Sequence, residues 1–208
     1  MAKLKMAWPN RITLMRILLV WPFIYMVLKI NQDGYENWAR YAALIIFAIM
    51  AISDGLDGYC ARKFNMVTEL GAFLDPLADK LLITSTCILL SLQRNAINGM
   101  VLPVEVVVLI IGKDILVVMG FIVIYFMTGK TFIVPVKIGK YCTAVQLIMV
   151  LFMLISPDIT PFWSDFIYCI RALWCLSSAL AIASAITYIR NGIKHVNEYE
   201  HNKQSGND

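Results

Sequence analysis

Six long apolar stretches, separated by short polar breaks, dominate the pattern along the chain. A membrane-spanning helix needs about 20 predominantly apolar residues, and backbone in hydrocarbon must be hydrogen-bonded within its own segment, which a helix achieves. The breaks carry turn-forming residues, as in NQDG and QRNAING. The pattern therefore predicts an all-α integral membrane protein with six transmembrane helices. The predicted spans cover about 14–30, 39–60, 72–92, 101–128, 138–156 and 165–190.

The placement of Lys and Arg predicts the orientation of the spans. An even number of spans puts both termini on one side of the membrane, and most basic residues then fall on that side. Because cytoplasmic loops carry the excess of Lys and Arg, we expect the N- and C-termini to be cytoplasmic. The cytoplasmic set is Lys3, Lys5, Arg11, Arg16, Arg62, Lys63, Lys80, Lys130, Lys137, Lys140, Arg190, Lys194 and Lys203, and the opposite set is Lys29, Arg40, Arg94 and Arg171.

The two ends of the chain differ from the spans. Residues 3–8 alternate loosely between lysine and apolar side chains, which fits either a short interfacial helix or a frayed terminus. The start MAKLKMAWPN lacks the apolar core of a cleavable signal peptide, so we expect the first span to remain as its own insertion signal. Residues 195–208 form a short polar tail. The length fits one domain over residues 1–208.

Composition supports lipid as the main surroundings. The 208 residues are 60% hydrophobic and 15% charged, whereas a soluble domain is nearer half apolar and a quarter charged. The net charge of +4 is not gathered into a basic stripe, so nucleic acid is not an expected partner. The five cysteines are odd in number and lack CxxC spacing, so we expect packing roles and neither disulfides nor a zinc site.

The second and third spans carry four carboxylates at helical spacing. Asp54 and Asp57 are three residues apart and Asp75 and Asp79 four apart, so each pair lies on one face of its helix. The short connection can bring both pairs together. An ionised carboxylate in a spanning helix costs ~3 kcal/mol, and four repel one another. Mg²⁺, Mn²⁺ or Ca²⁺ would neutralise them. Acidic groups that simply face water at the helix ends are the alternative.

Small residues and an arginine lie among these carboxylates. Gly58, Ala61 and Gly71 let another helix or a bulky ligand approach the backbone. A metal held by carboxylates needs further ligands, and phosphate oxygens are the usual complement to Mg²⁺. Arg62 can form a bidentate fork with a phosphate. Packing alone would explain some of the small residues, but the combination predicts an anionic, phosphate-bearing ligand.

The segment from Asp54 to Asp79 resembles the signature of the CDP-alcohol phosphatidyltransferase family. That signature has the form D-x2-D-G-x2-A-R, about eight residues, then G-x3-D-x3-D. This chain has Asp54-Gly-Leu-Asp57-Gly58-Tyr-Cys-Ala61-Arg62, then eight residues, then Gly71-Ala-Phe-Leu-Asp75-Pro-Leu-Ala-Asp79. Every fixed position is present. The resemblance extends over nearly the whole chain, including residues 10–16 and 137–140.

This resemblance implies a reaction and a site. A CDP-linked lipid, usually CDP-diacylglycerol, would give its phosphatidyl group to an alcohol and release CMP. Two divalent ions, Mg²⁺ or Mn²⁺, would be bound, and Asp79 would also act as the general base. The resemblance further implies a homodimer. The placement of Lys and Arg puts the site on the cytoplasmic side, and we expect the membrane to be a bacterial inner membrane. The resemblance assigns the metal ligands to Asp54, Asp57, Asp75 and Asp79, and the CDP pocket to Gly58, Ala61, Arg62 and Gly71.

The acceptor alcohol is less clearly marked in the sequence. Lys137 and Lys140 precede the fifth span and can bind an acceptor phosphate, although membrane anchoring is an equal alternative. Lys113 and Asp114 lie within the fourth span, where a charged pair is expensive and by default functional. Family members that use glycerol 3-phosphate commonly show Arg-Glu there. We expect glycerol 3-phosphate as acceptor, with phosphatidylglycerol, as in the cardiolipin synthases of this family, as the alternative.

Two other classes of protein use carboxylates within a membrane. A membrane prenyltransferase binds a lipid diphosphate through two aspartate motifs, but these usually lie far apart in sequence and the fold needs more than six spans. A cation transporter would favour inverted repeats and broken helices, and neither is visible here.

Overall fold

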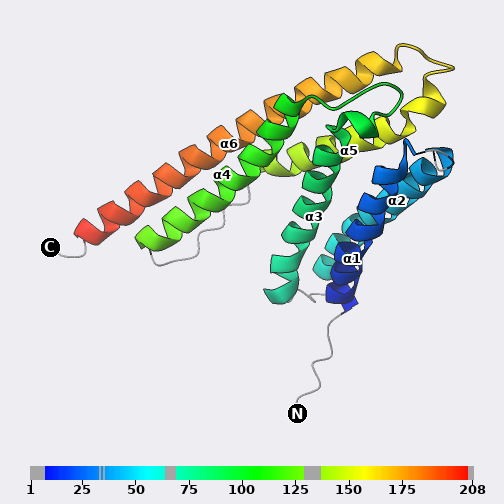
Figure 1. Ribbon diagram of the computed structural model, residues 1–208. Coiled ribbons are helices and arrows are strands. Elements are labelled where there is room, and N and C mark those ends of the chain that lie inside the picture. The colour runs from blue at the N-terminus through cyan, green and yellow to red at the C-terminus, as the bar shows by residue number, and fades with distance from the viewer. Residues whose placement is uncertain (1–7, 33, 35, 64–68, 129–136, 206–208) are drawn as a thin grey trace. The chain divides into compact units, whose positions relative to one another are not determined.

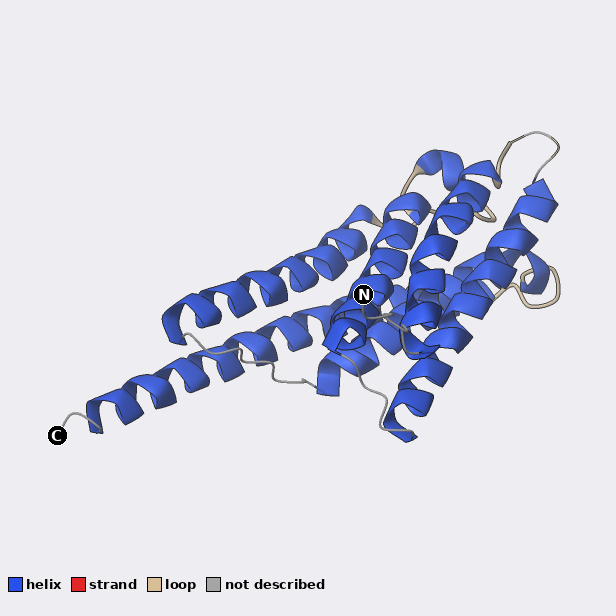
Figure 2. Ribbon diagram, turned by 90° about the horizontal axis from the view of Figure 1, so that it is seen from below, coloured by secondary structure: helices blue, strands red, loops and turns tan. Residues whose placement is uncertain are grey.

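The structure, a computed structural model, consists of α-helices joined by short connections (Figure 1). It describes the backbone of residues 8–32, 34, 36–63, 69–128 and 137–205, and the side chains of residues 14–32, 34, 37–53, 80–120, 122–124, 126 and 138–194. Helices are the only regular elements over these ranges (Figure 2). They are α1 (Trp8–Lys29), α2 (Glu36–Lys63), α3 (Glu69–Leu90), the 3₁₀ turn η1 (Gln93–Asn95), α4 (Val104–Thr128), α5 (Lys137–Ile159) and α6 (Phe166–Ser205).

The all-α prediction is confirmed, and each predicted span overlaps one helix. Three helical segments are long and apolar enough to cross a membrane: Val104–Ile124, Ile138–Ile159 and Phe166–Lys194. Two shorter apolar segments lie at Asn37–Ser53 and Lys80–Leu90. The number of spans and their orientation stay predictions. The predicted polar tail begins as a continuation of α6, which ends at Ser205.

The helices fall into two compact units. Unit 1 comprises residues 1–103 and 147–170, and unit 2 comprises residues 104–146 and 171–208. In unit 1, α1 packs against both α2 and α3. The single domain predicted over the whole chain stays a prediction.

The core of unit 1 follows from the helical period of its apolar residues. On α2, Ala39, Ala43, Phe47 and Met50 recur every three or four residues and are all buried. Phe23 of α1 is also buried, and its ring centroid lies 5.9 Å from that of Phe47. The two alanines leave room for a neighbouring backbone, and the larger side chains fill the space further along. This apolar stripe forms the buried face of α2 over these residues.

A tight turn closes the connection between α3 and α4. Asn98 and Gly99 both have positive φ, 52° and 70°, and the flanking Ile97 and Met100 exchange two backbone hydrogen bonds of 3.0 and 2.9 Å. Asn-Gly is the preferred pair for such a turn, because both central residues must adopt φ above zero. The break predicted at QRNAING is therefore confirmed. The Asn31 amide, just after α1, donates to the carbonyls of Arg94 and Ala96 in the same connection.

In unit 2, close approaches at glycines join α4 to α6. A Cβ at Gly120 would lie 2.8 Å from a ring carbon of Tyr188, and a Cβ at Gly192 would lie 3.2 Å from Ile124 Cδ1. Contacts below 3.0 Å require the neighbour to move. A Cβ at Gly112, also on α4, would meet nothing within 4 Å. A side chain at Gly120 therefore requires the Tyr188 ring to shift, whereas one at Gly112 meets no neighbour.

We expect Gly120→Ala to be less stable than Gly112→Ala by about 1–3 kcal/mol, the usual cost of an extra methyl in a packed contact. Both changes gain the same helix propensity, so the difference reports packing alone. The measurement is the midpoint of thermal unfolding of each detergent-solubilised variant. Adding Tyr188→Leu should remove most of the difference. Equal midpoints for the two single variants would contradict the close contact at Gly120.

Candidate functional site

The acidic motif occupies the end of α2 and the first half of α3, two consecutive helices. Asp54 and Asp57 lie near the end of α2, and Asp75 and Asp79 lie in the first half of α3. The helical backbone confirms the expected setting, in which spacings of three and four residues put each pair on one face. Both helices pack against α1. The side chains of all four aspartates lie outside the described residues, so their convergence on a metal stays a prediction.

The predicted CDP pocket uses the same helix ends. Gly58, Ala61 and Arg62 lie in the last turns of α2, and Gly71 lies in the first turn of α3, four residues before Asp75. Their side chains and surroundings also fall outside the described residues. All four positions lie in the last turns of α2 or the first turn of α3. In the sequence, only the five residues 64–68 separate the two helices.

Lys113 is buried inside unit 2 and paired there. Its ammonium lies 3.1 Å from Asp114 Oδ1 and 3.9 Å from the Cys142 sulfur on α5. The Gln146 amide lies 3.3 Å from the same sulfur. Both Cys142 and Gln146 are fully buried, and Lys113 is 8% exposed. The charge is therefore buried within unit 2 beside polar partners.

The three candidate acceptor lysines differ in setting. Lys140 is exposed on the first turn of α5. Lys137 is the first residue of that helix, and its side chain lies outside the described residues. Lys113 is buried on α4, as described above. An exposed lysine near a helix start can reach a soluble anion, whereas a buried one can act only on a ligand that enters unit 2.

Sequence reasoning missed the polar partners of these charges. Cys142 and Gln146 are four residues apart on α5 and so share a face, which is a visible signal. Cys142 was expected only to pack. Arg40 was interpreted from sequence as a topology signal, but it forms an ion pair with Asp158. The sequence signal for such a partner was a charge inside an apolar run.

A model of the CDP-alcohol phosphatidyltransferase family matches residues 6–189, which includes the acidic motif and most of the helices. The chain belongs to this family. The resemblance inferred from the motif is thus confirmed, and so is the expectation of a phosphatidyltransferase enzyme.

Bacterial relatives resemble the chain over nearly its full length. A protein of Pseudomonas fluorescens is 32% identical over 195 residues, covering 90% of this chain and 91% of the relative. A protein of Escherichia coli strain K12 is 30% identical over 182 residues, covering 87% and 92%. Each carries the name CDP-diacylglycerol–glycerol-3-phosphate 3-phosphatidyltransferase. Membership in this family removes the prenyltransferase and transporter alternatives.

Proposed function

We propose that the protein transfers the phosphatidyl group of CDP-diacylglycerol to glycerol 3-phosphate, giving phosphatidylglycerophosphate and CMP. The observation that carries this proposal is the likeness to two relatives named for that reaction, at 30–32% identity over 87–90% of this chain. A hydroxyl oxygen of the acceptor bonds to the lipid-linked phosphorus. The bond from that phosphorus to the CMP oxygen breaks, and the hydroxyl proton passes to the protein.

The donor set at the ends of α2 and α3 fits divalent metal ions. Four carboxylates supply hard oxygen ligands of the kind that Mg²⁺ and Mn²⁺ prefer. We propose that Asp54, Asp57, Asp75 and Asp79 hold two such ions. When bound, the ions would offset the negative charge of the diphosphate and of the leaving CMP.

The remaining residues of the motif have separate roles in this proposal. Arg62 forms a bidentate fork with a phosphate of the CDP group, which strengthens as charge builds on the leaving group. Gly58, Ala61 and Gly71 lack bulky side chains, so the nucleotide can approach the helix backbones. Asp79 accepts the proton of the attacking hydroxyl, a role that requires it within about 3 Å of that oxygen.

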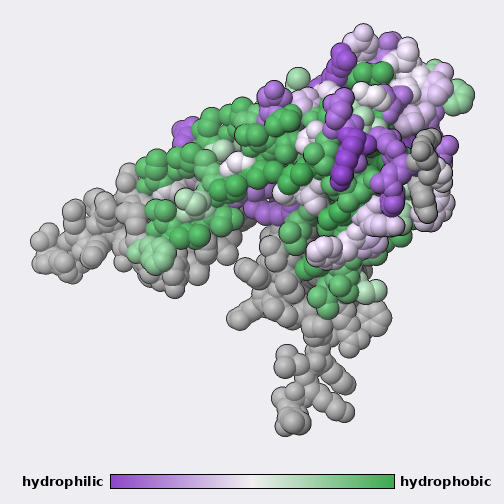
Figure 3. All heavy atoms as spheres, viewed as in Figure 1, coloured by the Kyte–Doolittle hydropathy of each residue, from purple (hydrophilic) through white to green (hydrophobic). Residues whose placement is uncertain are grey.

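The proposed topology has six spans, with both termini and the acidic motif at the cytoplasmic side of a bacterial inner membrane. Two features support its membrane setting. Trp38 and Tyr41 near the start of α2 and Trp163 after α5 are exposed, and Trp and Tyr favour membrane interfaces. Figure 3 shows hydrophobic residues over the visible side of α4 and polar residues at the connections of unit 1. A homodimer stays an expectation from the resemblance.

The deciding experiment is an acceptor panel. Purified protein receives CDP-diacylglycerol, Mg²⁺ and one acceptor: glycerol 3-phosphate, phosphatidylglycerol, serine or inositol phosphate. We expect CMP release and a phosphatidylglycerophosphate product only with the first. Cardiolipin formed from phosphatidylglycerol would establish the alternative acceptor, which the Lys113-Asp114 pair in place of Arg-Glu favours. No CMP release with any acceptor would overturn the proposal.

Replacing both Lys137 and Lys140 with Ala should raise the KM for glycerol 3-phosphate by about 10-fold or more, because a hydrogen bond to a charged group contributes about 1.5–3 kcal/mol. The KM for CDP-diacylglycerol should change little. Lys29→Ala, at the opposite end of the predicted spans, is the matched control. If the KM for glycerol 3-phosphate and the KM for CDP-diacylglycerol both stay unchanged, the two lysines are assigned to membrane anchoring.

A further inference from the structure

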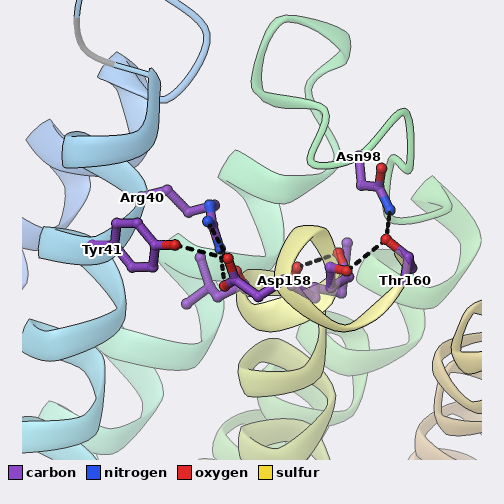
Figure 4. Close-up of polar contacts among 8 residues, drawn as sticks. Arg40, Tyr41, Asn98, Asp158 and Thr160 are labelled. Atoms are coloured by element: carbon purple, nitrogen blue, oxygen red, sulfur yellow. Dashed lines mark hydrogen bonds and ion pairs between the residues drawn. The ribbon is translucent and has the colours of Figure 1, made fainter. Parts of the chain in front are cut away.

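Among the described residues, an ion pair joins the start of α2 to the last turn of α5 within unit 1. The Arg40 guanidinium donates two hydrogen bonds to the Asp158 carboxylate, at 2.6 and 2.8 Å, and a third at 3.0 Å to the Leu154 carbonyl. Tyr41 Oη donates to the same carboxylate at 2.8 Å (Figure 4). The Arg40 side chain is 6% exposed and that of Asp158 is 35% exposed.

The turn of α5 that receives Arg40 is held in shape locally. Pro157 lies inside α5 and has no N–H to donate to the preceding turn. The Ser156 hydroxyl donates at 2.8 Å to the Met153 carbonyl, the group that this proline leaves without its usual partner. The Thr160 amide and hydroxyl both donate to the Ser156 carbonyl, at 3.0 and 2.9 Å. Asp158 therefore stands on a well-determined turn, which makes it a fixed anchor for Arg40.

Over residues 37–53, where its side chains are described, the rest of the inward face of α2 is apolar and gives no such directional hold. Ala39, Ala43, Phe47 and Met50 make apolar contacts, and such contacts change little when a helix slides or rotates slightly. In lipid they lack even the hydrophobic drive that operates in water. A planar guanidinium bound at two oxygens accepts one orientation only. The Arg40–Asp158 pair is thus suited to fix the rotation and axial position of α2.

We propose that Arg40 and Asp158 are positioning residues for the metal site carried by α2. Asp54 lies about 20 Å further along the same helix, by the helical rise of 1.5 Å per residue. Because a helix is stiff over this length, an error in rotation or register at Arg40 is passed on to the carboxylates. This inference rests on the proposed function, in which α2 supplies metal ligands.

The test replaces the pair with apolar residues of similar size in the double variant Arg40→Met, Asp158→Leu. Exchanging a buried ion pair for hydrophobic residues often leaves stability unchanged. Removing only one partner is destabilising, because it leaves a buried charge without a counter-charge. A purely structural pair would therefore leave the double variant like the wild type in every assay. A positioning pair would leave its thermal midpoint near that of the wild type but weaken Mn²⁺ binding, followed by the electron paramagnetic resonance signal of free Mn²⁺.

We expect the double variant to bind Mn²⁺ about 10-fold more weakly, the lower end of the effect seen when support for metal ligands is lost. Its kcat should fall by about 10- to 100-fold, since small displacements of reacting groups are costly, with a smaller change in the KM for CDP-diacylglycerol. Ser91→Ala is the matched control. It removes a hydroxyl of unit 1 that donates to the Ile88 carbonyl at the end of α3 and is not part of the Arg40–Asp158 network.

Separate outcomes test the two proposals. Wild-type protein that neither binds Mn²⁺ nor releases CMP would overturn the proposed function. Wild-type protein that does both, beside a folded double variant with the same Mn²⁺ affinity and kcat, would overturn the positioning role. If the double variant does not fold, Arg40→Lys serves instead, because it keeps the charge but loses the planar fork. The same 10-fold weakening is then expected, and wild-type affinity would again overturn the inference.

Discussion

Asp79→Asn should lower kcat for CMP release by at least about 100-fold, because a positioned general base contributes about 10²- to 10⁴-fold. Asparagine has nearly the shape of aspartate but cannot accept the hydroxyl proton. A loss of metal charge at the same residue adds to the effect. The measurement is single-turnover CMP release with saturating CDP-diacylglycerol and glycerol 3-phosphate, so that substrate binding does not limit the rate.

The control for this change is Asp165→Asn, which alters an exposed aspartate in the connection between α5 and α6. It should release CMP at the wild-type rate. Far-UV circular dichroism should show the same helical content in both variants. A rate near wild type in Asp79→Asn would remove this residue from the role of base. A loss of helical content would instead assign the defect to folding.

The helical fold was predictable because each apolar run is long and bounded by polar or turn-forming residues. The Asn98-Gly99 turn was predictable for the same local reason. The end of α6 was not, because hydropathy marks where lipid contact stops and not where a helix stops. Residues 195–205 are mostly polar, yet they continue the helix begun by the apolar part.

Part of the candidate site could be predicted from residue spacing within one helix, and part depends on contacts between residues far apart in the sequence. The four aspartates are recognisable because three- and four-residue spacings within one helix are visible in the sequence. The pairing of Arg40 with Asp158 joins positions 118 residues apart, and no local pattern connects them. The contact of Lys113 with Cys142, across 29 residues, is hidden for the same reason. In each case a charge within an apolar run signals that a partner exists, but only the fold says which residue it is.

Removing divalent metal should abolish activity completely and also lower the stability of the protein. With excess EDTA, CMP release should fall to the background, and either Mg²⁺ or Mn²⁺ should restore it. In the proposed site, the four carboxylates at the ends of α2 and α3 would repel one another without metal. A ligand that binds only the folded state at about 100 times its dissociation constant adds about 2.7 kcal/mol of stability. We therefore expect the thermal midpoint to rise on adding metal, and titrating each ion separately would show which binds more tightly.

Asp57→Asn provides the control that separates a bound metal from a general salt effect. This variant loses one proposed ligand and one repelling charge, so its metal-free form should be at least as stable as metal-free wild type. Its thermal midpoint should respond weakly to Mg²⁺ or Mn²⁺. If metal raised both midpoints equally, the ion would be acting elsewhere on the protein or on the lipid. If the wild type kept its activity after thorough chelation, the four aspartates would need another explanation, because ionised carboxylates at a membrane boundary are costly without a counter-charge.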